Sequence, residues 1–224
     1  MDTSLRLEKI ISLIDQGVIA DIGCDHALVC LGAILQKKAH KAYACDLRKG
    51  PLHQAALNIQ AHGLQDQIIL RLQDGIQDLP SDVQEVIIAG MGGKLMIDIL
   101  SIGIPDHVKT LLLAPHKDLK ALRTFLMHQG FELEEWMVHE QHFYPILKAT
   151  RQSDFKEARL LDEESLWLGD NVHIDQDYLD FLVNRKQALE KLLLKVDSTS
   201  KAHQEFQHEL TLVNNRFNQV KDLF

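Results

Sequence analysis

Short apolar runs alternate with amphipathic stretches over the first 130 residues of the chain. Apolar runs of strand length that end in turn residues are typical of buried parallel strands. They predict strands at residues 17–23, 41–47, 67–75, 85–93 and 109–115. Apolar residues recur at helical spacing between them and predict helices at residues 4–15, 27–37, 52–63, 94–103 and 118–130. This order predicts an α/β fold, a doubly wound parallel sheet with helices on both faces.

The remainder of the chain follows other patterns. Residues 131–141 and 143–151 predict an antiparallel strand pair, and residues 153–175 show no strong period. Two helical seams follow, with residues spaced by four and three: Tyr178, Leu182, Arg185, Leu189, Leu192 and Val196, then Phe206, Leu210, Val213, Phe217, Val220 and Phe224. These seams predict a C-terminal antiparallel helical hairpin, a coiled coil. We therefore expect one domain at residues 1–151 and a connector with the hairpin at residues 152–224.

Composition and charge narrow the class of protein. The chain is 46% hydrophobic and 25% charged, and no apolar run approaches the ~20 residues of a membrane span. We expect a cytoplasmic protein that does not associate with a membrane. Cys24, Cys30 and Cys45 have no metal-type spacing, so they are interpreted as reduced thiols, and no metal is expected. The formal net charge of −8 gives no hint of nucleic-acid binding, although a local basic patch could suffice.

The segment ADIGCDHA, residues 20–27, follows the first predicted strand, where ligands bind in open α/β sheets. Gly23 gives the sharp turn, and backbone N–H groups could face a ligand. A dinucleotide loop would read Gly-x-Gly-x-x-Gly, whereas Asp25 here would repel a phosphate. Asp21 and Asp25 suit a ligand with cationic groups, and S-adenosylmethionine fits because it carries ammonium and sulfonium groups. Turn and capping chemistry is the alternative explanation for both acids.

The next two strand tips also carry acids. Asp46 ends the second strand roughly twenty residues beyond the first loop, where an acid grips a ribose hydroxyl in doubly wound sheets. Asp74 precedes Gly75 at the third tip and could meet the exocyclic amine of an adenine. A plain Asp-Gly turn is the alternative at that position.

The fourth and fifth tips are rich in glycine and in basic residues. Gly90, Gly92 and Gly93 surround Met91, so the backbone either approaches something closely or adopts positive φ. Met91 then forms a wall for ligands, or the glycines serve the close packing of a turn. His116 would project over the site. A basic rim on the same side is a further possibility, although solvated faces would also explain its members: Lys37, Lys38, Lys41, Arg48, Lys49, Lys94, Lys117, Lys120 and Arg123.

Taken together, these motifs resemble the TrmK family. The resemblance covers about residues 3 to 152 and rests on RLEKIISLI, ADIGCDHA, GPLHQAALNIQAHGL, QDG, IIAGMGGKLMIDIL and FYPILKATR. Members of that family are bacterial tRNA (adenine-N1)-methyltransferases that modify adenosine 22. The resemblance implies a class I (Rossmann-like) methyltransferase fold, with S-adenosylmethionine as cofactor and tRNA as partner.

The resemblance also implies roles for residues at the strand tips. The methionine part of the cofactor would lie against the first loop, the ribose and adenine against the second and third tips, and the pocket floor would come from the fourth. The expected residues are Asp21, Gly23, Cys24 and Asp25, then Asp46 and Leu47, then Asp74 and Gly75, and finally Gly90, Met91 and Gly92. His26, Met91 and His116 are expected to neighbour the target base.

Two alternatives remain open from the sequence. One is a methyltransferase that acts on a small molecule or a protein. The other is a non-catalytic RNA-binding protein, motivated by Ala114 and His116 where the family tends to carry Gln-Pro-Asn. The sequence leaves the oligomeric state undecided, and a monomer is the working expectation.

Overall fold

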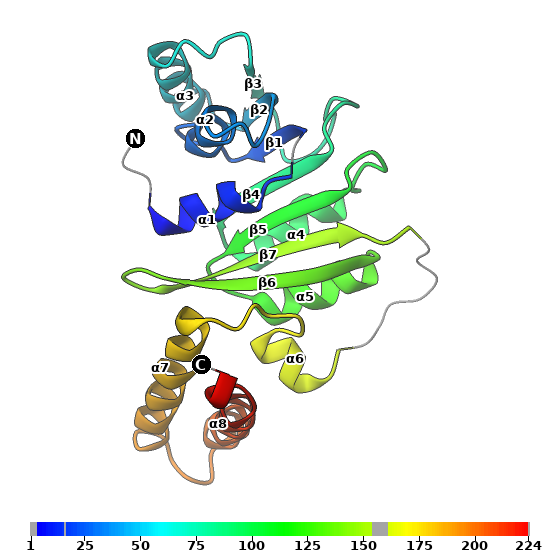
Figure 1. Ribbon diagram of the computed structural model, residues 1–224. Helices are drawn as coiled ribbons and strands as arrows, with labels where there is room; N and C mark the ends of the chain where they lie inside the picture. Colours follow the sequence, from blue (N-terminus) through cyan, green and yellow to red (C-terminus); the bar gives the residue numbers. More distant parts are fainter. Residues whose placement is uncertain (1–3, 16, 154–160, 224) are drawn as a thin grey trace.

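The computed structural model describes residues 4–15, 17–153 and 161–223 and contains one seven-stranded sheet with strand order β3-β2-β1-β4-β5-β7-β6 (Figure 1). The strands are β1 (Val18–Ile22), β2 (Lys41–Asp46), β3 (Ile68–Leu72), β4 (Glu85–Met91), β5 (Thr110–Pro115), β6 (Phe131–His139) and β7 (Phe143–Arg151). Strands β1 to β5 pair in parallel, while β7 pairs antiparallel with both β5 and β6. The predicted doubly wound sheet and its terminal antiparallel pair are confirmed.

Helices cover both faces of this sheet, because successive side chains of a strand point to opposite sides. On one face lie α1 (Leu5–Leu13), α2 (Leu28–Leu35) and α3 (Lys49–Ala61), and on the other lie α4 (Gly93–Ser101) and α5 (Leu119–His128) (Figure 1). In β1, Ile19 belongs to the core beneath the first group, while Val18 and Ala20 belong to the core beneath the second.

Local signals explain the helix boundaries. The Ser4 side chain accepts a hydrogen bond from the Leu7 backbone at 3.3 Å, so Ser4 caps α1 as the sequence predicts. Gly63 and Gly130 have φ of 67° and 79° and follow the ends of α3 and α5.

The C-terminal helices α7 (Gln176–Leu193) and α8 (Lys201–Val220) pack against each other, and η1 (Lys221–Leu223) follows (Figure 1). Tyr178, Leu182, Leu189 and Val213 of the predicted seams are fully buried between them. Arg185 instead pairs with Glu209 of α8, and Val196 lies beyond the end of α7. Phe224 falls outside the described residues. The helical pair is therefore present, and its description as a coiled coil stays a prediction.

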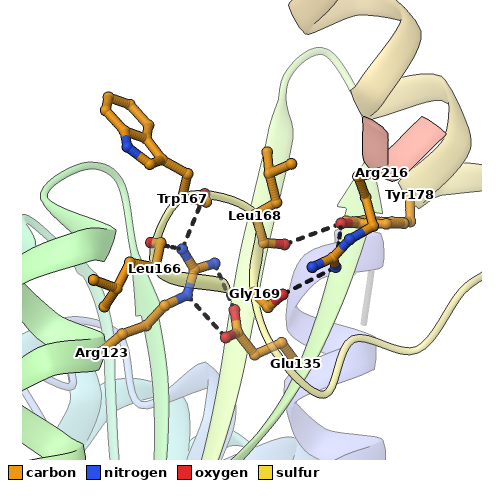
Figure 2. Close-up of polar contacts among 8 residues, drawn as sticks. All are labelled: Arg123, Glu135, Leu166, Trp167, Leu168, Gly169, Tyr178 and Arg216. Carbon is orange, nitrogen blue, oxygen red and sulfur yellow. Dashed lines mark hydrogen bonds and ion pairs between the residues drawn. The ribbon is translucent and has the colours of Figure 1, made fainter. Parts of the chain in front are cut away.

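A short helix, α6 (Glu163–Leu168), connects the sheet to the hairpin and was not predicted. Arg123 of α5 makes two hydrogen bonds to Glu135 of β6, at 2.8 and 2.7 Å. Its remaining nitrogen donates to the carbonyls of Leu166 and Trp167 at 2.7 and 3.1 Å (Figure 2). These long-range bonds, rather than helical periodicity, fix α6 against the sheet.

A second arginine completes this connection. Arg216 of α8 donates to Glu164 at 2.8 Å, to the Gly169 carbonyl at 3.0 Å and to the Tyr178 hydroxyl at 3.3 Å. Tyr178 in turn donates to the Leu168 carbonyl at 3.0 Å (Figure 2). We call the set of Arg123, Glu135, Tyr178 and Arg216, with the carbonyls that they bind, the junction.

Candidate active site

A cavity of about 580 Å³ opens at the carboxyl ends of β1, β2 and β4. We call it the tip cavity. Most of the predicted site residues line it: Asp21, Gly23, Cys24, Asp25, His26, Asp46, Leu47, Asp74, Gly75, Gly90 and Met91. Its volume suits a ligand of nucleoside size. The sheet therefore gathers residues that lie up to 70 positions apart, as expected at the carboxyl edge of a doubly wound sheet.

Two buried carboxylates in the tip cavity are only weakly compensated. Asp21 is 4% exposed and Asp46 is 5% exposed. Burial, together with the nearby Asp46 carboxylate, raises the pKa of Asp21 to about 7. Asp46 accepts a hydrogen bond from the Arg48 backbone at 2.8 Å, and the Arg48 Nε atom stands 3.6 Å from the same oxygen. Because Arg48 is mostly exposed, it compensates this pair only weakly.

The thiols beside these carboxylates are held in the neutral form. Burial, assisted by Asp21, raises the pKa of Cys45 to about 12 and the pKa of Cys24 still further. Cys30 is also buried, and none of the three cysteines forms a disulfide. A neutral thiol is a poor nucleophile, so the arrangement does not favour cysteine chemistry.

The first loop differs from its sequence-based interpretation in one respect. The backbone N–H groups of Gly23 and Cys24 do not face the tip cavity as free donors, because both donate to the Cys45 carbonyl, at 2.8 and 3.0 Å. Gly23 has φ of 75°, and a Cβ atom there would run into the Met91 side chain. The loop thus offers a ligand its carboxylates and close approach, but not the amides of Gly23 and Cys24.

The glycines of the fourth tip serve two purposes. Gly90 has φ of 76° and lies where the register of β4 and β5 shifts, and it lines the tip cavity. A Cβ atom on Gly93 would lie only 2.8 Å from the Lys117 carbonyl oxygen, so this glycine serves close turn packing. Gly92 caps α4 and does not line the cavity. Close turn packing therefore accounts for Gly93, while a wall for ligands at Gly90 and Met91 stays a prediction.

The two histidines expected near the target base occupy different places. His26 lines the tip cavity, is about half exposed, and has its Nε2 atom 3.5 Å from Asp25. His116 lies behind the residues that line the cavity, with its Nε2 atom 3.9 Å from the position of a Cβ on Gly90. Its ring meets Tyr144 edge-on, with centroids 6.5 Å apart. His116 therefore lies beside Gly90 of the cavity wall without lining the cavity.

Four of the nine candidates for a basic rim do not belong to it. Arg123 is 3% exposed and belongs to the junction, because its partner Glu135 lies on the neighbouring strand. Lys41 begins β2 and so lies at the opposite end from Asp46, with Lys37 and Lys38 close by in sequence. Only Arg48 among the rim candidates lines the tip cavity.

Several residues lining the tip cavity were not predicted from the sequence. They are Arg6, Leu7, Ile22, Leu28, Val29, Gln73, Ala89, Leu95 and Ile99. Gln73 donates a hydrogen bond to the Gly75 carbonyl at 2.9 Å and so fixes the third tip. Arg6 and Leu7 come from α1, which precedes β1 and reaches the cavity only through tertiary packing.

Neither a metal-binding cluster nor a membrane-spanning helix is present among the described residues. No three histidine, cysteine or acidic side chains in the described ranges gather closely enough to hold a metal ion. Within the same ranges, no helix combines the length and apolar character needed to cross a membrane.

The fold, with an acid-lined cavity at the strand tips, defines a nucleotide-binding α/β protein of the class I methyltransferase type. A sequence profile described as "Methyltransferase domain" matches residues 3–147. The chain therefore belongs to the methyltransferase-domain family.

Individual relatives agree with this assignment. The tRNA (adenine(22)-N(1))-methyltransferase of Bacillus subtilis (strain 168) is 32% identical over 142 residues, which are 62% of this chain and 60% of that relative's length. TrmK of M. capricolum, solved in complex with S-adenosyl-homocysteine, superimposes with a TM-score of 0.84 at 24% identity, over 97% of this chain and 99% of the other. Streptococcus pneumoniae Sp1610, solved with S-adenosyl-L-methionine, gives 0.83 at 26% identity, over 96% and 99%.

Proposed function

We propose that the protein is an S-adenosylmethionine-dependent tRNA methyltransferase that modifies N1 of adenosine 22. The observation that carries the proposal is the pair of buried carboxylates, Asp21 and Asp46, in the tip cavity. The similarity to the Bacillus subtilis enzyme supports the choice of tRNA and of position 22.

The residues present fit this cofactor. Two buried acids that Arg48 compensates only weakly disfavour a phosphate beside them and favour a ligand with ammonium and sulfonium groups. Asp21, Gly23, Cys24 and Asp25 would hold the amino-acid part, Asp46 and Leu47 the ribose, and Asp74 and Gly75 the adenine. Gly90 and Met91 would close the floor, with Gly92 behind them at the start of α4. When bound, S-adenosylmethionine supplies an electrophilic methyl group.

The chain acts on the acceptor mainly by positioning it. Adenine N1 is a neutral lone-pair nucleophile with no proton to remove before attack, so no strong general base is required. The acceptor base would enter flipped out of its stack. His26 and Met91 line the cavity that it would meet, and His116 lies beside Gly90 of the cavity wall, so these three are the proposed neighbours of the base.

A labelled-methyl assay tests the proposal. The protein is incubated with methyl-labelled S-adenosylmethionine and unmodified tRNA, and the product is mapped by nucleoside analysis. We expect one N1-methyladenosine at position 22. Transfer to another position, or none from a sample that binds the cofactor, would contradict the proposal.

Two variants separate the site from the fold. Asp46→Asn should weaken cofactor binding about tenfold or more in calorimetry, because the ribose loses a charged hydrogen-bond partner. Asp82→Asn is the matched control, since Asp82 pairs with Lys41 at 2.8 Å at the opposite end of β2. Equal affinities of both variants would remove Asp46 from the site.

The two alternatives predict different outcomes. A methyltransferase for small molecules or proteins would bind the cofactor tightly and give no tRNA gel shift. A non-catalytic RNA-binding protein would bind tRNA without turnover.

We further infer a monomer in the cytoplasm, built from a catalytic domain at 1–151 and a connector with the hairpin at 152–224. Light scattering on the full chain tests the monomer. Limited proteolysis between residues 152 and 162 tests the division, since two domains would each survive the cut.

A further inference from the structure

Arg6 brings a positive charge to a cavity otherwise dominated by acids. It is the second residue of α1 and lines the tip cavity together with Asp21 and Asp25. Its Nε atom is buried and has no hydrogen-bond partner among the described residues. A buried guanidinium nitrogen without an acceptor costs free energy, so this atom points to an acceptor that the chain itself does not supply.

The end of the β6–β7 hairpin holds Arg6 in place. The backbone N–H group of Arg6 donates to the Glu140 carboxylate at 2.9 Å. Its guanidinium lies 4.9 Å from the centroid of the Tyr144 ring, close enough for a cation–π interaction. Tyr144 also meets the rings of His116 and His142 edge-on. The side chain is thus oriented before any ligand arrives, which lowers the entropic cost of binding.

We propose that Arg6 is the oxyanion-binding residue of the tip cavity and receives the α-carboxylate of S-adenosylmethionine. This inference rests on the proposed function and adds a residue to that site. The amino-acid end of the cofactor carries an ammonium and a carboxylate. Asp21 and Asp25 suit the ammonium, and Arg6 supplies the complementary charge for the carboxylate across the same cavity. Tyr144 is a positioning residue, because it acts through Arg6.

A tRNA phosphate is the other source of an oxyanion at this place, since the Arg6 side chain is only partly buried. The two sources are separable. Decarboxylated S-adenosylmethionine lacks only the carboxylate, and RNA binding depends on salt in proportion to the phosphates that are neutralised.

The experiment is a cycle of two proteins and two ligands in calorimetry. Wild type should bind S-adenosylmethionine about tenfold to a hundredfold more tightly than the decarboxylated form. Arg6→Gln should bind both forms with nearly equal affinity. Arg6→Lys should retain part of the discrimination, because it keeps the charge but loses the planar fork. Tyr144→Leu should weaken the discrimination, whereas Tyr144→Phe should preserve it.

Lys9→Gln is the matched control. Lys9 lies on the same helix, with its Nζ atom 5.3 Å from the centroid of the Trp136 ring, and does not line the tip cavity. It should discriminate as wild type does, which excludes a general effect of removing a cation from α1.

Each other outcome is decisive. If Arg6→Gln discriminates as wild type does, the carboxylate assignment is overturned. If it also lowers tRNA affinity and reduces the salt slope by about one, the oxyanion is a phosphate. Failure of wild type to bind S-adenosylmethionine at all would instead refute the proposed function, so the two failures are distinguishable.

Discussion

The tip cavity and the junction both bury charged side chains, but they treat them in opposite ways. At the junction, Arg123 and Glu135 are each 3% exposed and pair through two hydrogen bonds, and the remaining arginine nitrogen finds two carbonyls. In the tip cavity, Asp21 and Asp46 are buried almost as deeply, but they carry charge of the same sign. The Asp46 carboxylate therefore helps burial to raise the pKa of Asp21. The charges of the junction are thus paired within the chain, whereas those of the tip cavity are not.

This difference indicates what each region is for. A buried ion pair with its hydrogen bonds satisfied fixes geometry, because removing one partner leaves an uncompensated charge. Buried acids that are only weakly compensated are costly in the free protein and become favourable when a cationic ligand arrives. The junction therefore holds α6 and the hairpin against the sheet, while the carboxylates of the tip cavity are suited to bind a cationic ligand.

The largest expected effect comes from breaking the junction. Arg123→Met leaves the Glu135 carboxylate buried without its partner and should lower the free energy of unfolding by about 4 kcal/mol. Urea denaturation measures this. The double variant Arg123→Met with Glu135→Leu should recover most of the loss, since no charge remains buried. Lys120→Met is the surface control, and an equal effect there would contradict the assignment.

The tip cavity should respond to pH instead. The pKa of Asp21 is about 7 in the folded protein and near 3.8 when unfolded, so the folded state binds more protons between these values. Stability contributed by this residue is therefore lost as pH rises from about 4 to about 7. Between about pH 5 and about pH 8 the loss is about 3 kcal/mol.

Asp21→Asn should remove this loss of stability with rising pH, and so should stabilise the protein relative to wild type at about pH 8. Burial also raises the pKa of Glu85 to about 8, so wild type and variant share that further loss and only their difference is diagnostic. Denaturation curves at both pH values measure it. Identical pH slopes in the two proteins would show that Asp21 is not held neutral.

The sheet and most of the tip cavity could be predicted because their signals are local. An apolar run in the sequence predicts strand β1, and Asp21, Asp46 and Asp74 lie where such runs end. Parallel strands bring their ends to one edge, so residues distant in sequence become neighbours without further information. A likeness in these loops was enough to suggest the ligand class.

The junction and Arg6 could not be predicted for the same physical reason. Helix α6 has six residues, too few for a period, and Arg123 binds carbonyls 43 and 44 positions away. From the sequence alone, Arg123 is expected to be exposed to solvent, because the sequence does not show that Glu135 lies beside it. Arg6 likewise reaches the tip cavity only because α1 packs beside the β6–β7 hairpin.

The smallest expected effect isolates one hydroxyl of the junction. Tyr178→Phe keeps a fully buried ring but removes the bond donated to the Leu168 carbonyl and the one accepted from Arg216. We expect a loss of about 1 kcal/mol in the free energy of unfolding, with unchanged cofactor affinity. Tyr43→Phe is the matched control, because its hydroxyl binds the partly exposed Asp82 at 3.1 Å and should matter less. A larger loss in the control than in Tyr178→Phe would mean that hydroxyl hydrogen bonds at the junction are no more stabilising than those at the surface. The contrast between the junction and the tip cavity would then rest on the Arg123–Glu135 ion pair alone.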